Sequence, residues 1–197
     1  MVGTTKESHH TTRFLQAMND EDYHHPKEKI DQLLKYKDYL KGDILEVFAG
    51  QGNLTSFYTP FGNVTAMTKE EFGDSFDAIY KLRGEKRKFD VIDIDSYGYP
   101  DRFFPVVFEL MKKECLLVFT FPIIGCNCLN GITEQHFYTF YRSIPSIGDV
   151  VGCITDWGMR EWKICSLQDV TKIKRIYRFV FLCRQGKATE ICNVKNR

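Results

Sequence analysis

The chain has 197 residues, of which 27 are basic, 26 are acidic and 43% are hydrophobic. This length suits one sizeable domain and is too short for two ordinary domains joined by a linker. The composition is typical of a soluble globular protein, and no apolar run approaches the length that spans a bilayer. We therefore expect no membrane partner. A net charge of +1 leaves a nucleic-acid partner open, because the distribution of charge matters more than its sum.

The ends of the chain and its cysteines indicate the organisation and the compartment. Residues 1–25 are polar and lack a sustained period, so we expect a flexible arm or a flap over a site. Residues 26–197 are expected to form a single domain. No apolar stretch at the start resembles a signal peptide, which predicts a cytoplasmic protein. The seven cysteines are irregularly spaced and odd in number, which indicates reduced thiols and no metal site.

The predicted elements alternate between strand and helix along the chain. Helices are expected at 26–42, at 53 to about 60, at 73–88, at 100–114 and at 133–144. Strands are expected at 43–50, 63–68, 89–94, 115–122, near 150–155, at 161–167 and at 175–185. This order predicts an α/β fold with a mostly parallel sheet and an antiparallel last strand.

A glycine turn follows the first predicted strand, in the stretch LEVFAGQGN. Gly50 and Gly52 would let backbone amides approach a ligand at the start of the next helix. The turn lacks the third glycine of the dinucleotide fingerprint, and no phosphate-loop lysine follows it. NAD and ATP are therefore disfavoured as ligands.

The stretch FDVIDIDSYGY ends a buried strand in two acids, Asp93 and Asp95. In an open parallel sheet, ligands lie outside the carboxyl ends of the strands. A single acid there would equally be a solvated loop residue or a helix cap. Two acids beside an aromatic residue and a glycine favour a binding site.

The stretch EVFAGQGN resembles the first motif of class I S-adenosylmethionine-dependent methyltransferases. The resemblance implies a Rossmann-like sheet and S-adenosylmethionine as the cofactor, with its methionine end at the turn. FGDSFDAIY resembles a later motif of that family, which implies that Asp74 contacts the adenine. The ribose ligand stays open between Thr68, Glu70 and Glu71. The cofactor contacts that we expect are Glu46, Phe48, Ala49, Gly50, Gly52, Asn53, Thr68, Asp74 and Asp93.

Only 24 positions separate Gly50 from Asp74, fewer than a full strand-helix-strand passage needs. The spacing predicts that one helix or strand of the family sheet is shortened or lost. The cofactor pocket would then be more open on that side.

The stretch DIDSYGYP looks like the fourth motif of tRNA guanine N2-methyltransferases, in which Asp-Pro-Phe/Tyr-Gly is followed two residues later by proline. Ser96 stands where that family has its first proline. Methyl transfer to an exocyclic amine needs acceptors for the amine hydrogens as positive charge develops. The resemblance implies that Asp95 is this acceptor and that Tyr97 stacks on the base. Both are predicted to be catalytic. The substrate contacts that we expect are Ser96, Tyr97, Phe121 and Trp157.

Other stretches bear on the substrate. Phe121 would border the same crevice, although phenylalanine at such a position more often belongs to the core. Residues 155–162 read as a loop in which Trp157 stacks on a nucleotide, or as a plain hairpin turn. The basic clusters 81–88 and 171–178 would contact phosphate or form solvated faces.

The sequence therefore predicts an enzyme that transfers a methyl group from S-adenosylmethionine to an amino nitrogen, in a nucleobase of RNA or DNA. A protein or small-molecule methyltransferase is one alternative. A cofactor-binding partner subunit that has lost catalysis is another. The oligomeric state stays open.

Overall fold

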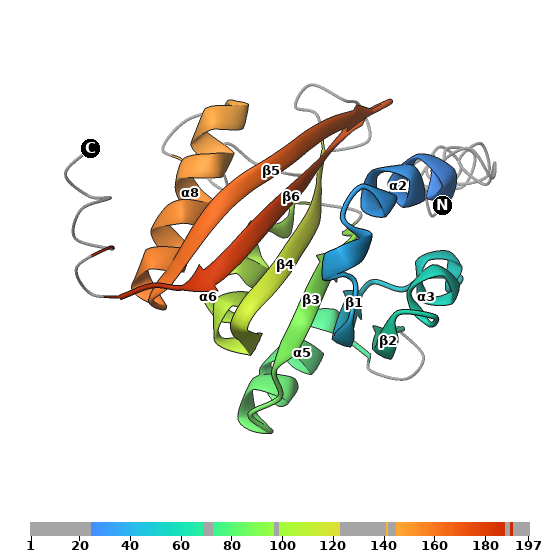
Figure 1. The fold of residues 1–197 in the computed structure, drawn as a ribbon, viewed down its shortest axis with the longest axis horizontal. Coiled ribbons are helices and arrows are strands. Elements are labelled where there is room, and N and C mark those ends of the chain that lie inside the picture. Colours follow the sequence, from blue (N-terminus) through green and yellow to red (C-terminus); the bar gives the residue numbers. More distant parts are fainter. Residues whose placement is uncertain are drawn as a thin grey trace, which may run out of the picture.

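The computed structural model of the protein describes residues 25–68, 73–96, 99–122, 141, 145–187 and 190. These residues contain a six-stranded sheet with the order β2-β1-β3-β4-β6-β5 (Figure 1). The strands are β1 (Gly42–Val47), β2 (Gly62–Met67), β3 (Phe89–Ile94), β4 (Met111–Pro122), β5 (Lys163–Ile173) and β6 (Ile176–Gln185). The first four strands pair in parallel, whereas β6 is antiparallel to both β4 and β5. The predicted α/β class is confirmed, including the antiparallel end of the sheet.

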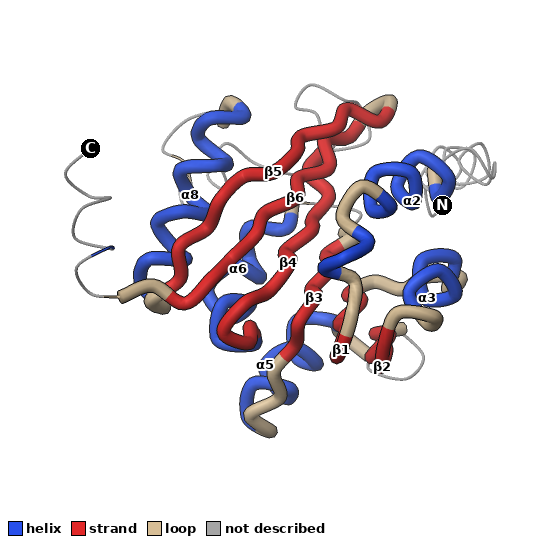
Figure 2. Tube along the Cα trace, in the orientation of Figure 1, coloured by secondary structure: helices blue, strands red, loops and turns tan. Residues whose placement is uncertain are grey.

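Helices cover both faces of the sheet (Figure 2). One face packs against α2 (Pro26–Leu34), the short helix η2 (Lys37–Tyr39) and α3 (Asn53–Tyr58). The other face packs against α5 (Ser75–Gly84), η3 (Pro100–Phe103), α6 (Phe104–Val107), η4 (Phe108–Leu110) and α8 (Ile147–Arg160). No helix in these parts of the chain is both long and apolar enough to cross a membrane.

The two-residue period of the strands divides the interior into two cores. On β3, Ile92 and Ile94 join the core beneath α5 and α8, whereas Val91 joins the core beneath α2 and α3. Near the carboxyl ends of the parallel strands, the residues that face α2 and α3 are polar rather than apolar. The buried polar residues at these positions are Glu46, Asp93, Thr120 and Arg178. The fold thus places a polar cluster where the parallel strands end.

Residues 147–160 form the helix α8, so the predicted strand near 150–155 and the predicted loop at 155–162 are wrong. A capping box starts the helix, because Ser146 and Asp149 each accept a hydrogen bond from the backbone N–H of the other. Val150 and Ile154 then repeat at helical spacing and are buried. The β-branched residues favoured a strand, but the cap and the packing outweigh that preference.

The helix predicted for 100–114 ends at Leu110, and β4 begins at Met111 rather than at Cys115. The longer strand places Lys112 and Lys113 at the amino end of the sheet. The helix predicted for 133–144 lies outside the described residues except for Tyr141, as do residues 1–24 of the predicted arm.

The passage between the glycine turn and Asp74 is short, as the spacing predicts. Its described part consists of α3 and β2, of six residues each. Among the described residues β2 forms one edge of the sheet, and they contain no further strand that shields the turn on that side.

Candidate active site

The turn after β1 has the backbone conformation that its glycines predict. Gly50 has a φ of 53° and Gly52 a φ of 77°, both in the left-handed region that glycine adopts at little cost. The Ala49 N–H donates to the Met67 carbonyl at 3.1 Å, which ties the turn to the end of β2. Thr68 follows Met67 and is thereby brought beside the turn. Asn53 begins α3 directly after Gly52.

Three aromatic rings connect the turn with Asp74. Phe48 meets Phe103 edge to face at a centroid distance of 5.4 Å, and Phe103 lies 5.9 Å from Phe76. The Asp74 carboxylate accepts the Phe76 N–H at 2.8 Å and caps α5. The Arg102 guanidinium lies 3.6 Å from the same Oδ1 atom. Asp74, the predicted adenine contact, is the N-cap of α5, and ring contacts connect the first turn of that helix with Phe48.

Two buried acids lie side by side on neighbouring strands. Glu46 on β1 is the register partner of Asp93 on β3. The Tyr58 hydroxyl of α3 donates to Asp93 Oδ2 at 2.6 Å, and the Thr55 hydroxyl donates to Glu46 Oε2 at 2.5 Å. The helix that follows the glycine turn thus covers the acids at the ends of both strands.

Arg178 of β6 is the buried counter-charge of this cluster. Its side chain is fully buried, and Nη2 donates to Asp93 Oδ2 at 2.5 Å. Nη1 lies 3.2 Å from Thr120 Oγ1 and 3.6 Å from Asp95 Oδ1. The expectation that residues 171–178 contact phosphate or form a solvated face is wrong for Arg178, which is buried. The signal that was missed is a single charge at an inward position of the apolar run IYRFVFL.

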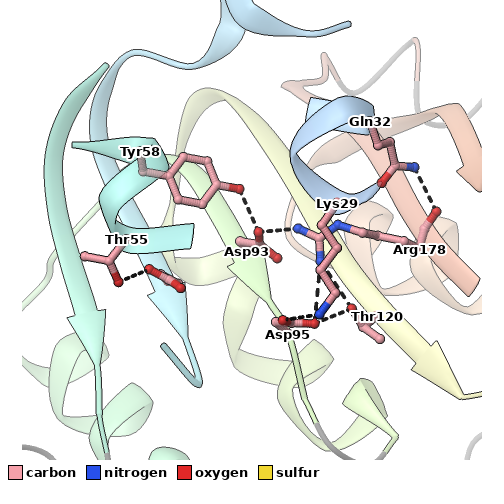
Figure 3. Close-up of polar contacts among 9 residues, drawn as sticks. Lys29, Gln32, Thr55, Tyr58, Asp93, Asp95, Thr120 and Arg178 are labelled. Atoms are coloured by element: carbon pink, nitrogen blue, oxygen red, sulfur yellow. Dashed lines mark hydrogen bonds and ion pairs between the residues drawn. The ribbon is translucent and has the colours of Figure 1, made fainter. Parts of the chain in front are cut away.

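Lys29 of α2 is the second cation beside Asp95 and contacts the other carboxylate oxygen from the one near Arg178 (Figure 3). Its Nζ lies 2.5 Å from Asp95 Oδ2, and the Thr120 hydroxyl donates to Oδ1 at 2.7 Å. The helix is anchored to β6, because the Gln32 side-chain amide donates to the Arg178 carbonyl at 3.1 Å. Two cations and a hydroxyl group therefore enclose the predicted acceptor carboxylate. Nothing in the sequence distinguishes Lys29 from the other lysines of this segment.

The surroundings shift the acids in opposite directions. Burial raises the pKa of Glu46 to about 7, and the nearby charges of Asp93 and Asp95 add to this rise. Burial also favours the neutral form of Asp95, but the charges of Lys29 and Arg178 outweigh it and lower the pKa of that carboxyl. Asp95 is therefore an ionised hydrogen-bond acceptor, whereas Glu46 changes charge near neutral pH.

The expected substrate residues are only partly brought together. Ser96 is buried directly after Asp95, whereas Tyr97 lies outside the described residues. Phe121 is buried in the core beneath α8, with its ring edge to face against Tyr99 at 4.9 Å.

The structure places Trp157 apart from Asp95. Trp157 lies near the end of α8, and the next residue, Gly158, packs beside Cys165 close to the start of β5. Cys165 and Cys115 both pair with Cys183, and Cys115 lies near the start of β4. That end of β5 is therefore level with the amino ends of the parallel strands, whereas Asp95 lies at their carboxyl ends. The guanidinium of Arg160 lies 4.4 Å from the centre of the Trp157 ring.

The chain has the fold of S-adenosylmethionine-dependent methyltransferases, as its similarity to solved structures shows. One similar structure is Trm1 from Pyrococcus horikoshii in complex with S-adenosyl-L-methionine. It has 14% identity and a TM-score of 0.62, over 85% of this chain and 57% of that one. Trm5b from Pyrococcus abyssi has 10% identity and a TM-score of 0.51, over 80% of this chain and 48% of that one. The chain therefore spans about half the length of these two proteins.

A third similar structure has nearly the same extent as this chain. It is a SAM dependent methyltransferase from Aquifex aeolicus, with 16% identity and a TM-score of 0.50, over 86% of this chain and 97% of that one. No protein-family model and no curated protein matches the sequence.

Proposed function

We propose that the protein transfers a methyl group from S-adenosylmethionine to an amino nitrogen of a nucleobase in RNA or DNA. The observation that carries this proposal is the contact between Asp95 and the end of β1, the strand that leads into the glycine turn. The Asp95 N–H donates to the carbonyl of Val47, the last residue before the turn, at 3.3 Å. A methyl donor held at the turn and a substrate held by Asp95 would therefore be neighbours.

The residues around the turn fit the cofactor. A Cβ atom added to Gly50 would meet no atom nearer than 3.8 Å, so a bound group has room to approach its backbone. S-adenosylmethionine supplies an electrophilic methyl group on a cationic sulfonium and also carries an ammonium group. Glu46 has no cationic partner among the ion pairs of the described residues, so its carboxylate suits a cationic ligand.

The acceptor step assigns a limited role to Asp95. In the proposed reaction the bond between sulfur and the methyl carbon would break, a bond from nitrogen to that carbon would form, and the amine would then lose one proton. Asp95 would accept a hydrogen bond from the amine and align its lone pair. Because the pKa of Asp95 is lowered, the released proton passes to solvent rather than to this carboxylate.

The β5–β6 hairpin supports a nucleic-acid substrate. Its exposed cations are Lys172, Lys174 and Arg175. The hairpin turn lies beyond the carboxyl end of β4, because Pro122 pairs with Ile176 (Figure 1). These cations are therefore at the same edge of the sheet as Asp95, where phosphate groups of a bound polynucleotide would pass.

A hydroxyl acceptor is a second candidate, and the contact between Lys29 and Asp95 favours it. An ammonium group 2.5 Å from Asp95 opposes the positive charge that develops on an amine. The same ammonium would stabilise an acceptor that loses its proton as it is methylated. The charge of Lys29 would therefore slow transfer to an amine and would assist transfer to a hydroxyl group.

Labelled S-adenosylmethionine incubated with RNA, DNA and protein separately tests the proposal. Mass spectrometry of digested nucleosides then separates methylated bases from methylated sugars. We expect label in a base amine of RNA or DNA. Label confined to protein would contradict the nucleic-acid substrate, and calorimetric cofactor binding without transfer to any fraction would indicate a subunit that has lost catalysis.

The variant Lys29→Met separates the two acceptors, with Lys27→Met as a control at an exposed position of the same helix. An amine acceptor predicts that kcat of the Lys29 variant is unchanged or higher, since the opposing charge is gone. A hydroxyl acceptor predicts a lower kcat. Cofactor affinity, measured alongside, shows whether the fold of the site survives.

A further inference from the structure

A cavity of about 580 Å³ lies at the amino ends of the parallel strands, opposite the candidate active site. We call this end of the sheet its amino edge, and the end at Asp95 its carboxyl edge. Its lining comes from the starts of β3, β4 and β5 and from the end of β6, which meet there because Lys163 pairs with Gln185. The charged residues of the lining are Lys88, Lys112, Lys113, Lys163, Asp90 and Glu114. Lysine therefore exceeds acid by two charges around the cavity.

The acids near the cavity are mostly engaged with a single lysine. Lys112 Nζ lies 2.7 Å from both Asp43 Oδ2 and Asp90 Oδ2. Asp90 also accepts the Asp43 N–H at 2.7 Å. The ion pairs among the described residues do not include the other three lysines of the lining.

Lys163 is the unusual member of this group. Its side chain is only 5% exposed, and its ammonium donates to the Lys112 carbonyl at 2.5 Å. Buried ammonium groups are rare without a carboxylate partner. Burial lowers the pKa of Lys163. Lys88 and Lys113 line the same cavity as this buried ammonium.

We propose that this cavity is a phosphate-binding site formed by Lys88, Lys113 and Lys163. A bound phosphate would supply the negative charge that the buried ammonium lacks and would offset the excess positive charge of the lysines that line the cavity. The Lys112 ion pairs fix the start of β4 and so hold Lys113 beside the cavity. The phosphate belongs either to a polynucleotide backbone or to a free phosphate-bearing molecule.

The site is distinct from the candidate active site and does not depend on methyl transfer. Seven positions of β4 separate Lys113 from Thr120, which corresponds to roughly 23 Å at the rise of an extended strand. A variant at one edge therefore leaves the groups at the other edge untouched.

The test measures binding of inorganic pyrophosphate to the full chain by calorimetry at low salt. The double variant Lys88→Gln/Lys113→Gln removes two exposed charges of the lining, and Lys27→Gln/Lys37→Gln removes two exposed charges elsewhere. We expect the dissociation constant to rise by roughly tenfold or more in the first variant and by less than about twofold in the control. Lys163→Met should give at least as large a loss, and the double variant decides the matter if Lys163→Met does not fold.

A single-stranded RNA oligonucleotide distinguishes the two sources of phosphate. Competition between RNA and pyrophosphate would identify a polynucleotide, whereas RNA binding that is unchanged in the double variant would identify a free phosphate compound. The proposal fails if the wild-type protein does not bind pyrophosphate at low salt, or if the control variant loses as much affinity as the cavity variant.

Discussion

At the carboxyl edge of the sheet, Asp93 and Asp95 face Arg178 and Lys29, whereas at the amino edge three lysines line a cavity and have no ion-pair partner among the residues that the structure describes. At the first edge, Asp93 and Asp95 form ion pairs within the protein, so these two side chains are held in place before any ligand binds. At the second edge, Lys112 pairs with Asp43 and Asp90, whereas the other three lysines of the lining do not occur in the ion pairs of the described residues. Charges that are paired within the protein therefore fix the geometry of the site. Charges that are not paired indicate the sign of the charge that a ligand would carry.

The same distinction applies within the carboxyl edge. Asp93 and Asp95 each lie within 4 Å of a cation, whereas the hydrogen bond described for Glu46 comes from the neutral hydroxyl of Thr55. Glu46 is thus the acid of this edge whose counter-charge is left for a cationic ligand, which is the property expected for a contact to the cofactor.

The largest expected effect comes from breaking the internal charge pairing at Arg178. Arg178→Met leaves Asp93 buried without its cation, and removal of one partner of a buried pair costs about 3–5 kcal/mol. Urea denaturation measures the free energy of unfolding. Arg175→Met, at an exposed position of the same hairpin, should change it by less than about 0.5 kcal/mol.

A double variant shows whether pairing, rather than packing, causes that loss. Asp93→Asn combined with Arg178→Met removes both charges and should recover part of the stability. Equal stability of the single and double variants would mean that the ion pair does not organise this edge.

Asp95→Ala should lower kcat and leave the affinity for the cofactor nearly unchanged. One lost contact to the developing charge typically lowers kcat on the order of a hundredfold or more, and the proposed cofactor site is the glycine turn rather than this side chain. Single-turnover kinetics and calorimetry measure the two quantities on the same preparation. Weakened cofactor binding with unchanged turnover of the bound complex would instead make Asp95 a cofactor ligand.

The pH dependence of cofactor binding tests Glu46. Its pKa is about 7, so the carboxylate that would hold a cation forms only as the pH rises through that value. Affinity for S-adenosylmethionine should increase by up to about tenfold per pH unit below 7 and level off above it. Glu46→Gln should remove this dependence. A wild-type affinity that is constant between pH 5.5 and 8 would exclude Glu46 as the ligand.

The raised pKa of Glu46 also affects folding. The folded state keeps its proton at pH values where the unfolded chain, with an ordinary glutamate pKa of about 4.3, has lost it. The contribution of Glu46 to stability therefore falls as the pH rises from about 4 to about 7. Denaturation of wild type and Glu46→Gln across this range measures it, and parallel curves would contradict the shift.

The smallest effect is expected at the β5–β6 hairpin. If Lys172 and Arg175 contact phosphate, the logarithm of the RNA affinity should fall steeply with the logarithm of salt concentration. Replacing either residue by glutamine should reduce that slope by nearly one. Fluorescence anisotropy across a salt series measures the slope, with Lys27→Gln as the control. An unchanged slope in both hairpin variants would place the polynucleotide elsewhere.

Local patterns in the sequence were enough to predict the elements on which the site stands. The apolar run FDVIDI predicts β3, and Asp74 with the residues after it predicts the cap and the helix α5. Gly50 and Gly52 predict a turn because their positive φ values are costly for other residues. The acids at the end of β3 followed from the general placement of ligands in parallel sheets. Each of these inferences uses preferences that act over a few neighbouring residues.

Only the tertiary structure decided which charges meet. Arg178 binds an acid 85 positions away, and Lys29 binds one 66 positions away. The residues before α8 carry a helix cap, but its β-branched run fits a strand equally well, and burial against the core settled the choice. The sequence by itself determined β3, the glycine turn and the position of the acids, because these depend on local backbone preference. The partners of those acids depend on which strand and helix pack beside them, and that is a property of the folded chain alone.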